Sequence, residues 1–380
     1  MTPDEVLEAA VKQTGLSEFH SNSWREGLEI LLADWAKSPF LNEMGRGWGE
    51  GLCVNALATR LRVDDFLRKN PAVAEAPVKR PVFIVGMPRT GTTMLSYLLD
   101  ADPQRRSFLK WEAYNLVPPA APGALRTDPR CLEELAKDQA MLKSPLAAMH
   151  VELSDGPTEC VHLMAQDFKS LMLAVTPTTA RTYEDWILFC DKASAMAHRK
   201  RAFQIMQSTN PGLWTLKMPS DSLFIRDLFN AFPDAKVIWT HRDPYVALTS
   251  IFNMRGSSRA NFNSDPDADH MRARWPLQLA LHAKRPLEVS RERPDDFYHL
   301  YYDDMMADPL AQIRKIYKWL GDEFTPQADA GMRAWLEANP QGKHGAHTYS
   351  MAKWGLSKRD LEPYFSDYLR EHPVATGVEA

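Results

Sequence analysis

The chain has 380 residues, 44% of them apolar, and a formal net charge of −4. This length and composition allow a sizeable hydrophobic core in one large domain or in two, and they exclude a globally disordered chain. The negative net charge disfavours a dedicated nucleic-acid-binding protein.

The first 75 residues or so are predicted to be helical. The stretches "SWREGLEILLADWAKS" and "GEGLCVNALATRLRVDDFLRKN" place apolar residues at helical spacing, and no strand pattern lies between them. The segment "PAVAEAPVKRP", from Pro71 to Pro81, is rich in proline and alanine and is a natural junction. We therefore predict a helical N-terminal extension over residues 1–77 and a second domain over residues 78–380.

Strands and helices alternate in the second part of the chain. Four short runs indicate strands: "PVFIVG", "LWTLK", "AKVIWTHR" and "DDFYHLYYDDM". Helical patterns follow them: "TTMLSYLLDADP", "SDSLFIRDLFNAFP" with Ser220 or Asp221 as its N-cap, "YVALTSIFNM" and "DPLAQIRKIYKWLG". This alternation predicts an α/β fold, with a parallel sheet flanked by helices. The mostly helical segments 112–212 and 254–290 are expected as insertions over the carboxyl ends of the strands, where ligands bind in such sheets.

The loop after the first predicted strand has the frame of a phosphate-binding loop. "GMPRTGTT", from Gly86 to Thr93, matches G-x-x-x-x-G-K-[ST] except that Thr92 takes the place of the lysine. Its glycines allow close backbone approach, and the amides at the start of the following helix attract an anion. Arg89 adds a cation that can fork onto a phosphate. Without the lysine that reaches the next phosphate, the loop suits a ligand with a single phosphate at this point.

A second anion site is predicted at "THRDPYVALTS". Arg242 follows a strand, and Ser250 lies eight residues later, about two helical turns into the next helix. Both residues belong to the carboxyl edge of the predicted sheet, which is also the edge of the first loop.

These two motifs resemble those of the sulfotransferases that use 3′-phosphoadenosine 5′-phosphosulfate (PAPS). "MPRTGTTML" is similar to their 5′-phosphosulfate loop, and "HRDPYVALTS" is similar to their 3′-phosphate motif. The stretch "LKMPSDSLFIRDLFNAFPDAKVIWTHRDP" resembles the bacterial branch of the family, related to the tyrosylprotein sulfotransferases, and the similarity covers roughly residues 80–370. The resemblance implies a P-loop NTPase-like fold, PAPS as co-substrate and PAP, its desulfonated form, as product. It assigns nucleotide binding to Pro88, Arg89, Thr90, Gly91, Thr92, Thr93, Arg242 and Ser250.

The resemblance also implies which residues carry the chemistry. Lys217, which ends "LWTLK", and Arg89 are expected to stabilise charge on the sulfuryl group and the leaving phosphate. Glu112, in "KWEA", is expected to remove the acceptor's proton, and a structural pairing with a lysine or arginine is the alternative. His150 and Glu159 are the reserve candidates for this base. No metal is expected, because the cations already present can neutralise the sulfuryl end.

Further residues have weaker assignments. His347 and Tyr349, in "GAHTYS", match a tail motif of the family and either approach the nucleotide or simply pack. Trp186 and Trp275 lie in the insertions and are candidates to line an acceptor pocket. The many Met, Leu, Phe and Trp residues of these insertions suit an apolar pocket or an ordinary core.

We expect a cytoplasmic transferase that moves a sulfuryl group from PAPS to a hydroxyl or amine of an unidentified small-molecule acceptor. The four cysteines are far apart, no signal peptide is apparent, and no apolar run is long enough to span a bilayer. No nucleic-acid partner is expected, and a homodimer is left open. Two alternatives remain. A P-loop kinase would need the missing lysine and an acidic Mg²⁺ ligand, and a non-catalytic nucleotide-binding scaffold would retain the loop but lose Glu112 and Lys217.

Overall fold

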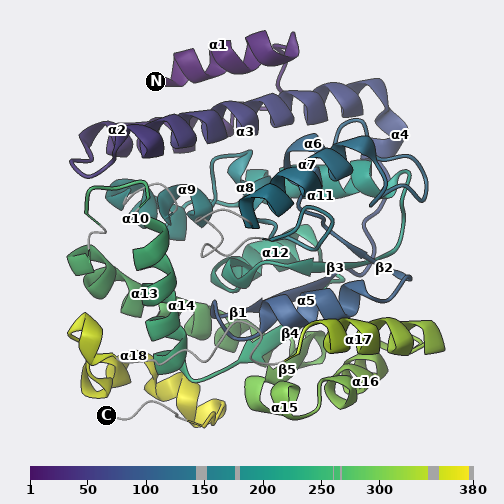
Figure 1. The fold of residues 1–380 in the computed structure, drawn as a ribbon, viewed down its shortest axis with the longest axis vertical. Coiled ribbons are helices and arrows are strands. Elements are labelled where there is room, and N and C mark those ends of the chain that lie inside the picture. The colour runs from purple at the N-terminus through teal and green to yellow at the C-terminus, as the bar shows by residue number, and fades with distance from the viewer. Residues whose placement is uncertain (143–151, 176–179, 260, 266–267, 341–350, 376–380) are drawn as a thin grey trace. The chain divides into compact units, whose positions relative to one another are not determined.

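The computed structural model describes residues 1–142, 152–175, 180–259, 261–265, 268–340 and 351–375 (Figure 1). The chain forms two compact units. The first comprises Met1–Lys79, Phe108–Gly212 and Arg255–Asp267, and the second comprises Arg80–Ser107, Leu213–Met254 and Ala268–Ala380. The predicted domain boundary near residue 77 stays a prediction.

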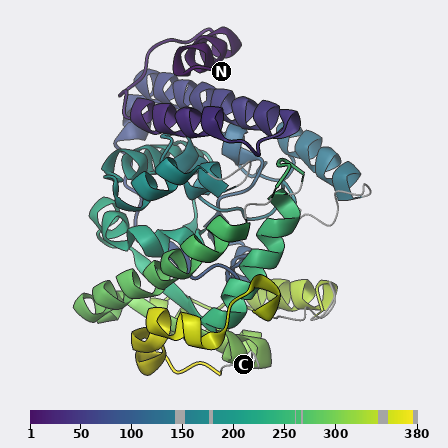
Figure 2. The ribbon, with the colours of Figure 1, turned by 90° about the vertical axis from the view of Figure 1, so that its left-hand side faces the viewer.

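The first unit is built from helices. They are α1 (Pro3–Thr14), α2 (Trp24–Lys37), α3 (Glu43–Lys69), α4 (Pro71–Ala74), α6 (Glu112–Asn115), α7 (Pro129–Leu142), α8 (Val161–Ala165), α9 (Leu171–Val175), α10 (Arg181–Phe189) and α11 (Ala193–Gln207). Thr2 and Glu5 form a capping box at the start of α1, and Asn42 caps α3. Figures 1 and 2 both show α1 lying along α3. The predicted helical character of the first 75 residues is thus confirmed.

A buried ion-pair network joins α3 to the segment that follows α8. Arg60 Nη1 lies 2.8 Å from Asp167 Oδ1, and the two side chains are 3% and 0% exposed. Ser194 donates to the other carboxylate oxygen of Asp167 at 2.6 Å, and Lys169 donates to Ser194 at 2.6 Å. Charges in a core are tolerated only when they are paired and hydrogen-bonded. The network therefore fixes the N-terminal helices in one core with residues from the middle of the chain.

The second unit contains a five-stranded parallel sheet, which confirms the predicted fold class. The strands are β1 (Val82–Gly86), β2 (Arg105–Ser107), β3 (Leu213–Lys217), β4 (Lys236–His241) and β5 (Phe297–Tyr301), in the order β2-β3-β1-β4-β5. Every residue of β1 is buried, as expected for the central strand of a covered parallel sheet. Because β1 lies between β3 and β4, the strand ends that carry the two predicted phosphate motifs are neighbours.

The helices of the second unit follow and flank these strands. They are α5 (Thr92–Asp100), η2 (Pro219–Phe224), α12 (Ile225–Ala231), α14 (Ala268–Glu292), η3 (Pro294–Asp296), α15 (Tyr302–Ala307), α16 (Pro309–Leu320), α17 (Pro326–Ala338), η4 (Ala352–Trp354) and α18 (Lys358–Glu371). The helix α13 (Pro244–Arg259) begins within the second phosphate motif, so Arg242 precedes the helix and Ser250 lies inside it.

Alternating side chains divide the sheet into two faces. Val82, Ile84, Ile238 and Leu300 belong to one apolar cluster with residues of α5, α16 and α17. The residues between them point to the other face, where Phe83 packs against Phe232 at 5.3 Å between ring centroids. The sheet is therefore covered on both sides, as the sequence predicts.

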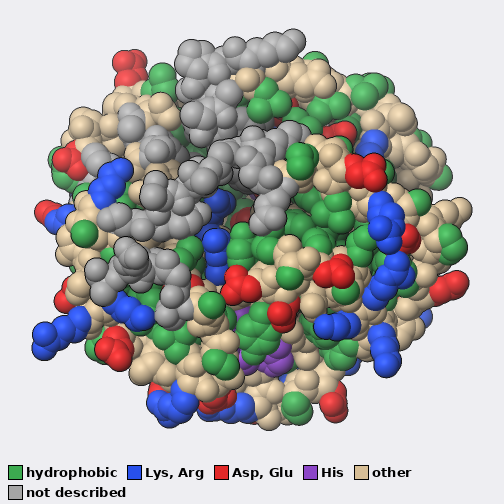
Figure 3. All heavy atoms as spheres, turned by 60° about the horizontal axis from the view of Figure 1, so that its bottom comes forward, with side chains coloured by type: hydrophobic (Ala, Val, Ile, Leu, Met, Phe, Trp, Pro, Cys, Tyr) green, Lys and Arg blue, Asp and Glu red, His purple; other side chains and the backbone are tan. Residues whose placement is uncertain are grey.

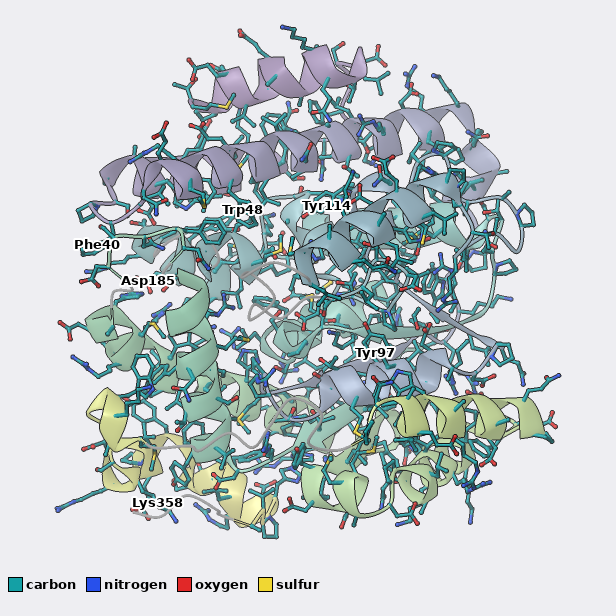
Figure 4. All side chains as sticks on the ribbon, in the orientation of Figure 1. Phe40, Trp48, Tyr97, Tyr114, Asp185 and Lys358 are labelled. Carbon is teal, nitrogen blue, oxygen red and sulfur yellow. The ribbon has the colours of Figure 1, made fainter. Side chains whose placement is uncertain are left out.

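Aromatic contacts attach the outer helices of the second unit. Tyr97 of α5, labelled in Figure 4, stacks on Trp335 of α17 with 5.8 Å between ring centroids. Lys358, at the start of α18 and also labelled there, lies 5.3 Å from the ring centre of Tyr245. These contacts hold α17 and α18 on the elements next to the predicted nucleotide site.

The structure differs from the sequence prediction in two local features. The edge strand β2 was not predicted, because Arg105 and Arg106 disguise it as an exposed turn. Arg105 is in fact buried, with hydrogen bonds to Tyr317 at 2.9 Å and to Asp322 at 2.8 Å. The helix expected to begin at Ser220 or Asp221 instead starts as the 3₁₀ segment η2, and α12 begins at Ile225.

Candidate active site

The predicted phosphate loop joins the end of β1 to the start of α5. Gly86 has a φ of 147°, and a Cβ there would lie 2.5 Å from Thr240 Oγ1. Gly91 has a φ of 90°, and a Cβ there would lie 3.2 Å from the ring of Tyr302. Only glycine adopts these conformations readily, so steric contacts explain why the motif has glycine at both positions. The loop has the shape that brings backbone amides close to an anion.

The two threonines at the start of α5 are not helix caps. Gly91 is the N-cap residue, and no side chain caps the helix. In the part of the chain that the structure describes, the hydroxyls of Thr92 and Thr93 have no hydrogen-bonding partner. The first amides of a helix also lack intrahelical acceptors. This end of α5 therefore presents donors that suit a phosphate.

Arg89 lies between the two predicted phosphate motifs. Its Nε donates to Ser250 Oγ at 3.0 Å, and its backbone carbonyl accepts from Arg242 Nη1 at 2.8 Å. Its φ is 71°, a left-handed value that is uncommon for a residue other than glycine. The structure thus brings Arg89, Arg242 and Ser250 together in one cluster of donors.

Arg242 is held in place from a second side by Tyr302. Its guanidinium carbon lies 3.9 Å from the centre of the Tyr302 ring, a close cation–π contact. Ser250, two turns into α13, is buried with 6% of its surface exposed. The two residues proposed for the 3′-phosphate are therefore positioned by their own surroundings.

A hydrogen bond between two threonines links the phosphate loop directly to β4. Thr90 and Thr240 hydroxyls are 2.5 Å apart, and the Thr90 hydroxyl also donates to the carbonyl of Met87 at 2.7 Å. Thr240 pairs in register with Gly86 across the sheet. The loop and the strand that leads to Arg242 are therefore fixed to one another.

A buried histidine supports the start of the loop. Burial lowers the pKa of His282 to about 3, so the ring is neutral at pH 7. Its Nδ1 lies 2.6 Å from Ser222 Oγ, and the ring also hydrogen-bonds the backbone carbonyls of Gly86 and Pro219. This contact fixes the carbonyl at which β1 ends and the loop begins.

Lys217 is the last residue of β3 and pairs in register with Ile84 of β1. Its side chain is buried, with 2% of the residue exposed. Because β3 and β1 are parallel neighbours, Lys217 ends at the same edge of the sheet as the loop. A buried lysine at this edge suits a role in charge stabilisation.

Glu112 is the first residue of α6 in the first unit and is 2% exposed. Its carboxylate accepts the backbone N–H of Leu109 at 3.1 Å. This backbone contact is not the pairing with a lysine or arginine that is the alternative to catalysis, and the assignment of Glu112 as the base stays a prediction. Glu159 lies beside α8 in the same unit, and His150 lies outside the described residues.

The remaining residues proposed from the sequence are His347, Tyr349, Trp186 and Trp275. His347 and Tyr349 lie outside the described residues. Trp186 donates to Glu26 at 3.2 Å, and Trp275 is buried with 4% of its surface exposed. Both tryptophans take part in packing, and their role in an acceptor pocket stays a prediction.

Sequence reasoning missed Thr240 and Tyr302. Both follow from the strand pattern, since Thr240 sits at the end of β4 and Tyr302 directly follows β5. In a parallel sheet the carboxyl ends meet at one edge, so a polar or aromatic residue at each strand end was a usable signal.

No helix within the described parts of the chain is long and apolar enough to cross a membrane.

Several solved structures share this architecture. The sulfotransferase STF9 of Mycobacterium avium is 39% identical in sequence, superposes with a TM-score of 0.92, and aligns over 98% of this chain and 97% of its own. The sulfotransferase STF1 of Mycobacterium tuberculosis H37Rv is 25% identical, with a TM-score of 0.84 over 97% of this chain and 99% of its own.

Curated relatives and a family profile agree with these structures. The omega-hydroxy-beta-dihydromenaquinone-9 sulfotransferases Stf3 of Mycobacterium bovis and Mycobacterium tuberculosis are each 28% identical over 249 residues, which is 63% of this chain and 62% of their own length. The match therefore spans less than two thirds of these relatives. The profile of the sulfotransferase family matches residues 81–326, which include the loop, Lys217, Arg242 and Ser250. The chain belongs to the sulfotransferase family.

Proposed function

We propose that the protein transfers a sulfuryl group from PAPS to a hydroxyl of an apolar small molecule. The observation that carries this proposal is the single cluster of Arg89, Arg242 and Ser250 beside a phosphate loop that lacks its lysine. Family membership supports a sulfuryl donor, and the cluster supports a donor with two separate phosphates.

The proposed binding of PAPS uses the two ends of this cluster. The 5′-phosphate lies against the amides and hydroxyls of Gly91, Thr92 and Thr93, which have the geometry of a helix-terminal anion site. The 3′-phosphate lies against Arg242 and Ser250. The side chain of Arg89 donates to Ser250, and the backbone carbonyl of Arg89 accepts from Arg242. Arg89 therefore connects the two ends of the cluster.

The proposed chemistry is an in-line displacement at sulfur. The bond from sulfur to the bridging phosphate oxygen breaks while a bond from sulfur to the acceptor oxygen forms. Lys217 and Arg89 stabilise the negative charge that develops on the bridging and sulfuryl oxygens. Glu112 is the proposed base for the acceptor's proton, on the strength of the sequence resemblance.

The missing lysine argues against the kinase alternative. In P-loop kinases that lysine grips the β- and γ-phosphates. Here the position is the first residue of α5, Thr92, which is 4% exposed. A threonine hydroxyl supplies one neutral donor, which suits a donor whose second group is a monoanionic sulfuryl.

The acceptor class is proposed from the curated relatives. Their name assigns them a hydroxylated dihydromenaquinone, a lipophilic molecule that offers its oxygen for sulfation. We extend only the chemical class, an apolar molecule with a free hydroxyl, to this chain.

A labelled-donor assay tests the proposal. Purified protein is incubated with PAPS carrying ³⁵S and with fractions of a cell extract separated by polarity, and labelled products are identified by mass spectrometry. We expect label in the lipid-soluble fraction with the wild type and on the order of 10²-fold less with Lys217→Ala. Label that appears only in peptides or polar metabolites would remove the apolar acceptor, and label from γ-labelled ATP in place of PAPS would remove the sulfotransferase assignment.

A further inference from the structure

Three imidazoles gather on one face of the sheet. His241 ends β4, His299 lies in β5, and His372 directly follows α18. Across the sheet Trp239 pairs with His299 and His241 pairs with Tyr301, so both histidines point to the same face. One ring nitrogen from each of the three lies within 4.8 Å of the others.

Two of these nitrogens are already at the separation of neighbouring metal ligands. His241 Nε2 and His299 Nδ1 are 3.0 Å apart. The third ring, His372, is 7% exposed, and its Nε2 is buried without a hydrogen-bonding partner among the described residues. A buried nitrogen left without a partner carries a desolvation cost, which a bound metal ion would relieve.

Tyrosine hydroxyls fix the far side of two of the rings. Tyr368 Oη lies 3.0 Å from His241 Nδ1, and Tyr301 Oη lies 3.2 Å from His372 Nδ1. When each Nδ1 donates its proton to the phenol oxygen, each Nε2 presents a lone pair. Metal-bound histidines almost always donate their other N–H to such an acceptor, which orients the ring.

We propose that His241, His299 and His372 form a binding site for a first-row transition-metal ion, with Zn²⁺ as the reference ion. Three imidazole nitrogens suit Zn²⁺, Co²⁺, Ni²⁺ or Cu²⁺, and the absence of oxygen donors among the three disfavours Mg²⁺ and Ca²⁺. Each ring is neutral in the bound state. His241 and His372 carry their protons on Nδ1, whereas the proton of His299, whose Nδ1 hydrogen-bonds His241 Nε2 at 3.0 Å without metal, moves to Nε2. Water takes the fourth position, as in other sites with three histidines.

The required movement is small and local. Zinc–nitrogen bonds of about 2.0–2.1 Å place tetrahedral ligand atoms roughly 3.4 Å apart, so the pair His241–His299 fits with little change. The rings of His241 and His372 are stacked at 4.1 Å between centroids. The three ligand atoms lie within 4.8 Å of one another, so ligation requires the His372 ring to turn until its nitrogen is roughly 3.4 Å from the other two. His299 is only half-buried. On the face that Figure 3 draws, some histidine atoms (purple) reach the surface beside hydrophobic side chains.

The site would connect α18 to β4, the strand that leads to Arg242. His372 follows α18, and His241 directly precedes Arg242. Tyr368 of α18 also hydrogen-bonds the backbone of Arg242. An ion bound here would therefore stabilise this end of the chain whether or not the protein transfers sulfuryl groups.

Metal titration of the full chain, without a histidine tag, tests the proposal. We expect one equivalent of Zn²⁺ to bind in calorimetry, and Co²⁺ to give visible d–d absorption without the near-ultraviolet band of thiolate ligands. His372→Ala should weaken Zn²⁺ binding at least tenfold, and Tyr301→Phe should weaken it by about 10-fold through loss of the ring's orientation. The control His20→Ala removes an exposed imidazole outside the cluster and should bind like the wild type.

Thermal melts separate ligation from folding. Without metal, the melting temperature of His372→Ala measures the loss of a buried, stacked ring, and it is the baseline from which the effect of the metal on this variant is read. With excess Zn²⁺ the melting temperature of the wild type should rise by mass action and that of His372→Ala should not. One equivalent bound equally by the wild type and His372→Ala, a thiolate band with Co²⁺, or no binding by the wild type would each overturn the site.

Discussion

Replacing Arg242 by alanine should weaken PAP much more than AMP. PAP carries the 3′-phosphate and AMP does not, so the difference between their losses isolates the contact proposed for Arg242. A charge-assisted contact contributes about 1.5–3 kcal/mol, which is a loss of about 10- to 150-fold for PAP. The structure adds a second effect, since Arg242 Nη1 also holds the carbonyl of Arg89 at 2.8 Å. Loss of that bond should weaken the binding of both nucleotides, by about 0.5–1.5 kcal/mol each.

Isothermal titration calorimetry with both nucleotides measures the two effects separately. A matched control is Arg226→Ala, which removes an arginine whose ion pair with Glu292 is more than half exposed and should leave both affinities unchanged. Equal losses for PAP and AMP in Arg242→Ala would show that Arg242 only supports the loop, and the assignment of the 3′-phosphate would fall.

Three further predictions address chemistry, stability and pH. Lys217→Ala and Glu112→Gln should each keep the affinity for PAP within a few-fold of the wild type but lose about 10²–10⁴ in turnover. Single-turnover sulfation measures this loss, and normal turnover in Glu112→Gln would mean that the base is another residue. Arg105→Met should lower the free energy of unfolding in urea by about 1–3 kcal/mol, because Tyr317 and Asp322 lose their hydrogen bonds from Arg105 while Asp322 keeps its ion pair with Arg80. A loss below about 0.5 kcal/mol would contradict this account of β2. His282 has a folded pKa of about 3, below its ordinary value of 6.5, so the unfolded chain takes up its proton first as the pH falls. His282 should therefore lower the free energy of unfolding progressively from about pH 6.5 down towards pH 3, by up to about 1.4 kcal/mol per pH unit. Urea unfolding at pH 7.5, 6.5 and 5.5 should show a free energy of unfolding that depends less steeply on pH in His282→Gln than in the wild type.

The sheet and its phosphate motifs could be predicted because local pattern and tertiary role agree there. "PVFIVG" is a continuous apolar run, and it forms the fully buried central strand β1. The residues of "MPRTGTTML" and "HRDPYVALTS" stand at fixed spacings in the sequence. Because β1 and β4 are parallel neighbours, the two motifs that follow them lie at the same edge of the sheet. The link between them, from Arg89 to Ser250, could not be predicted from spacing, because it depends on a left-handed loop residue.

What sequence reasoning missed depends on partners that are distant along the chain. β2 is polar because Arg105 is neutralised by Asp322, which lies 217 residues away in the sequence. Tyr302 is marked by its position directly after β5, but its contact with Arg242 depends on the order of the strands, so the local pattern indicates the residue and not its partner. The histidine cluster draws on β4, β5 and the end of α18, and no two of its members are adjacent in sequence.

The left-handed backbone of Arg89 has a consequence for laboratory evolution of this enzyme. Holding an arginine at a φ of 71° costs about 1 kcal/mol that a glycine would not incur. A screen for heat resistance alone weighs this strain against the 3.0 Å hydrogen bond from Arg89 to Ser250, and wherever glycine is selected it discards the cation that joins the two phosphate motifs. Thermostable descendants chosen in this way would fold better and work worse, so a useful screen has to retain the nucleotide as a second criterion.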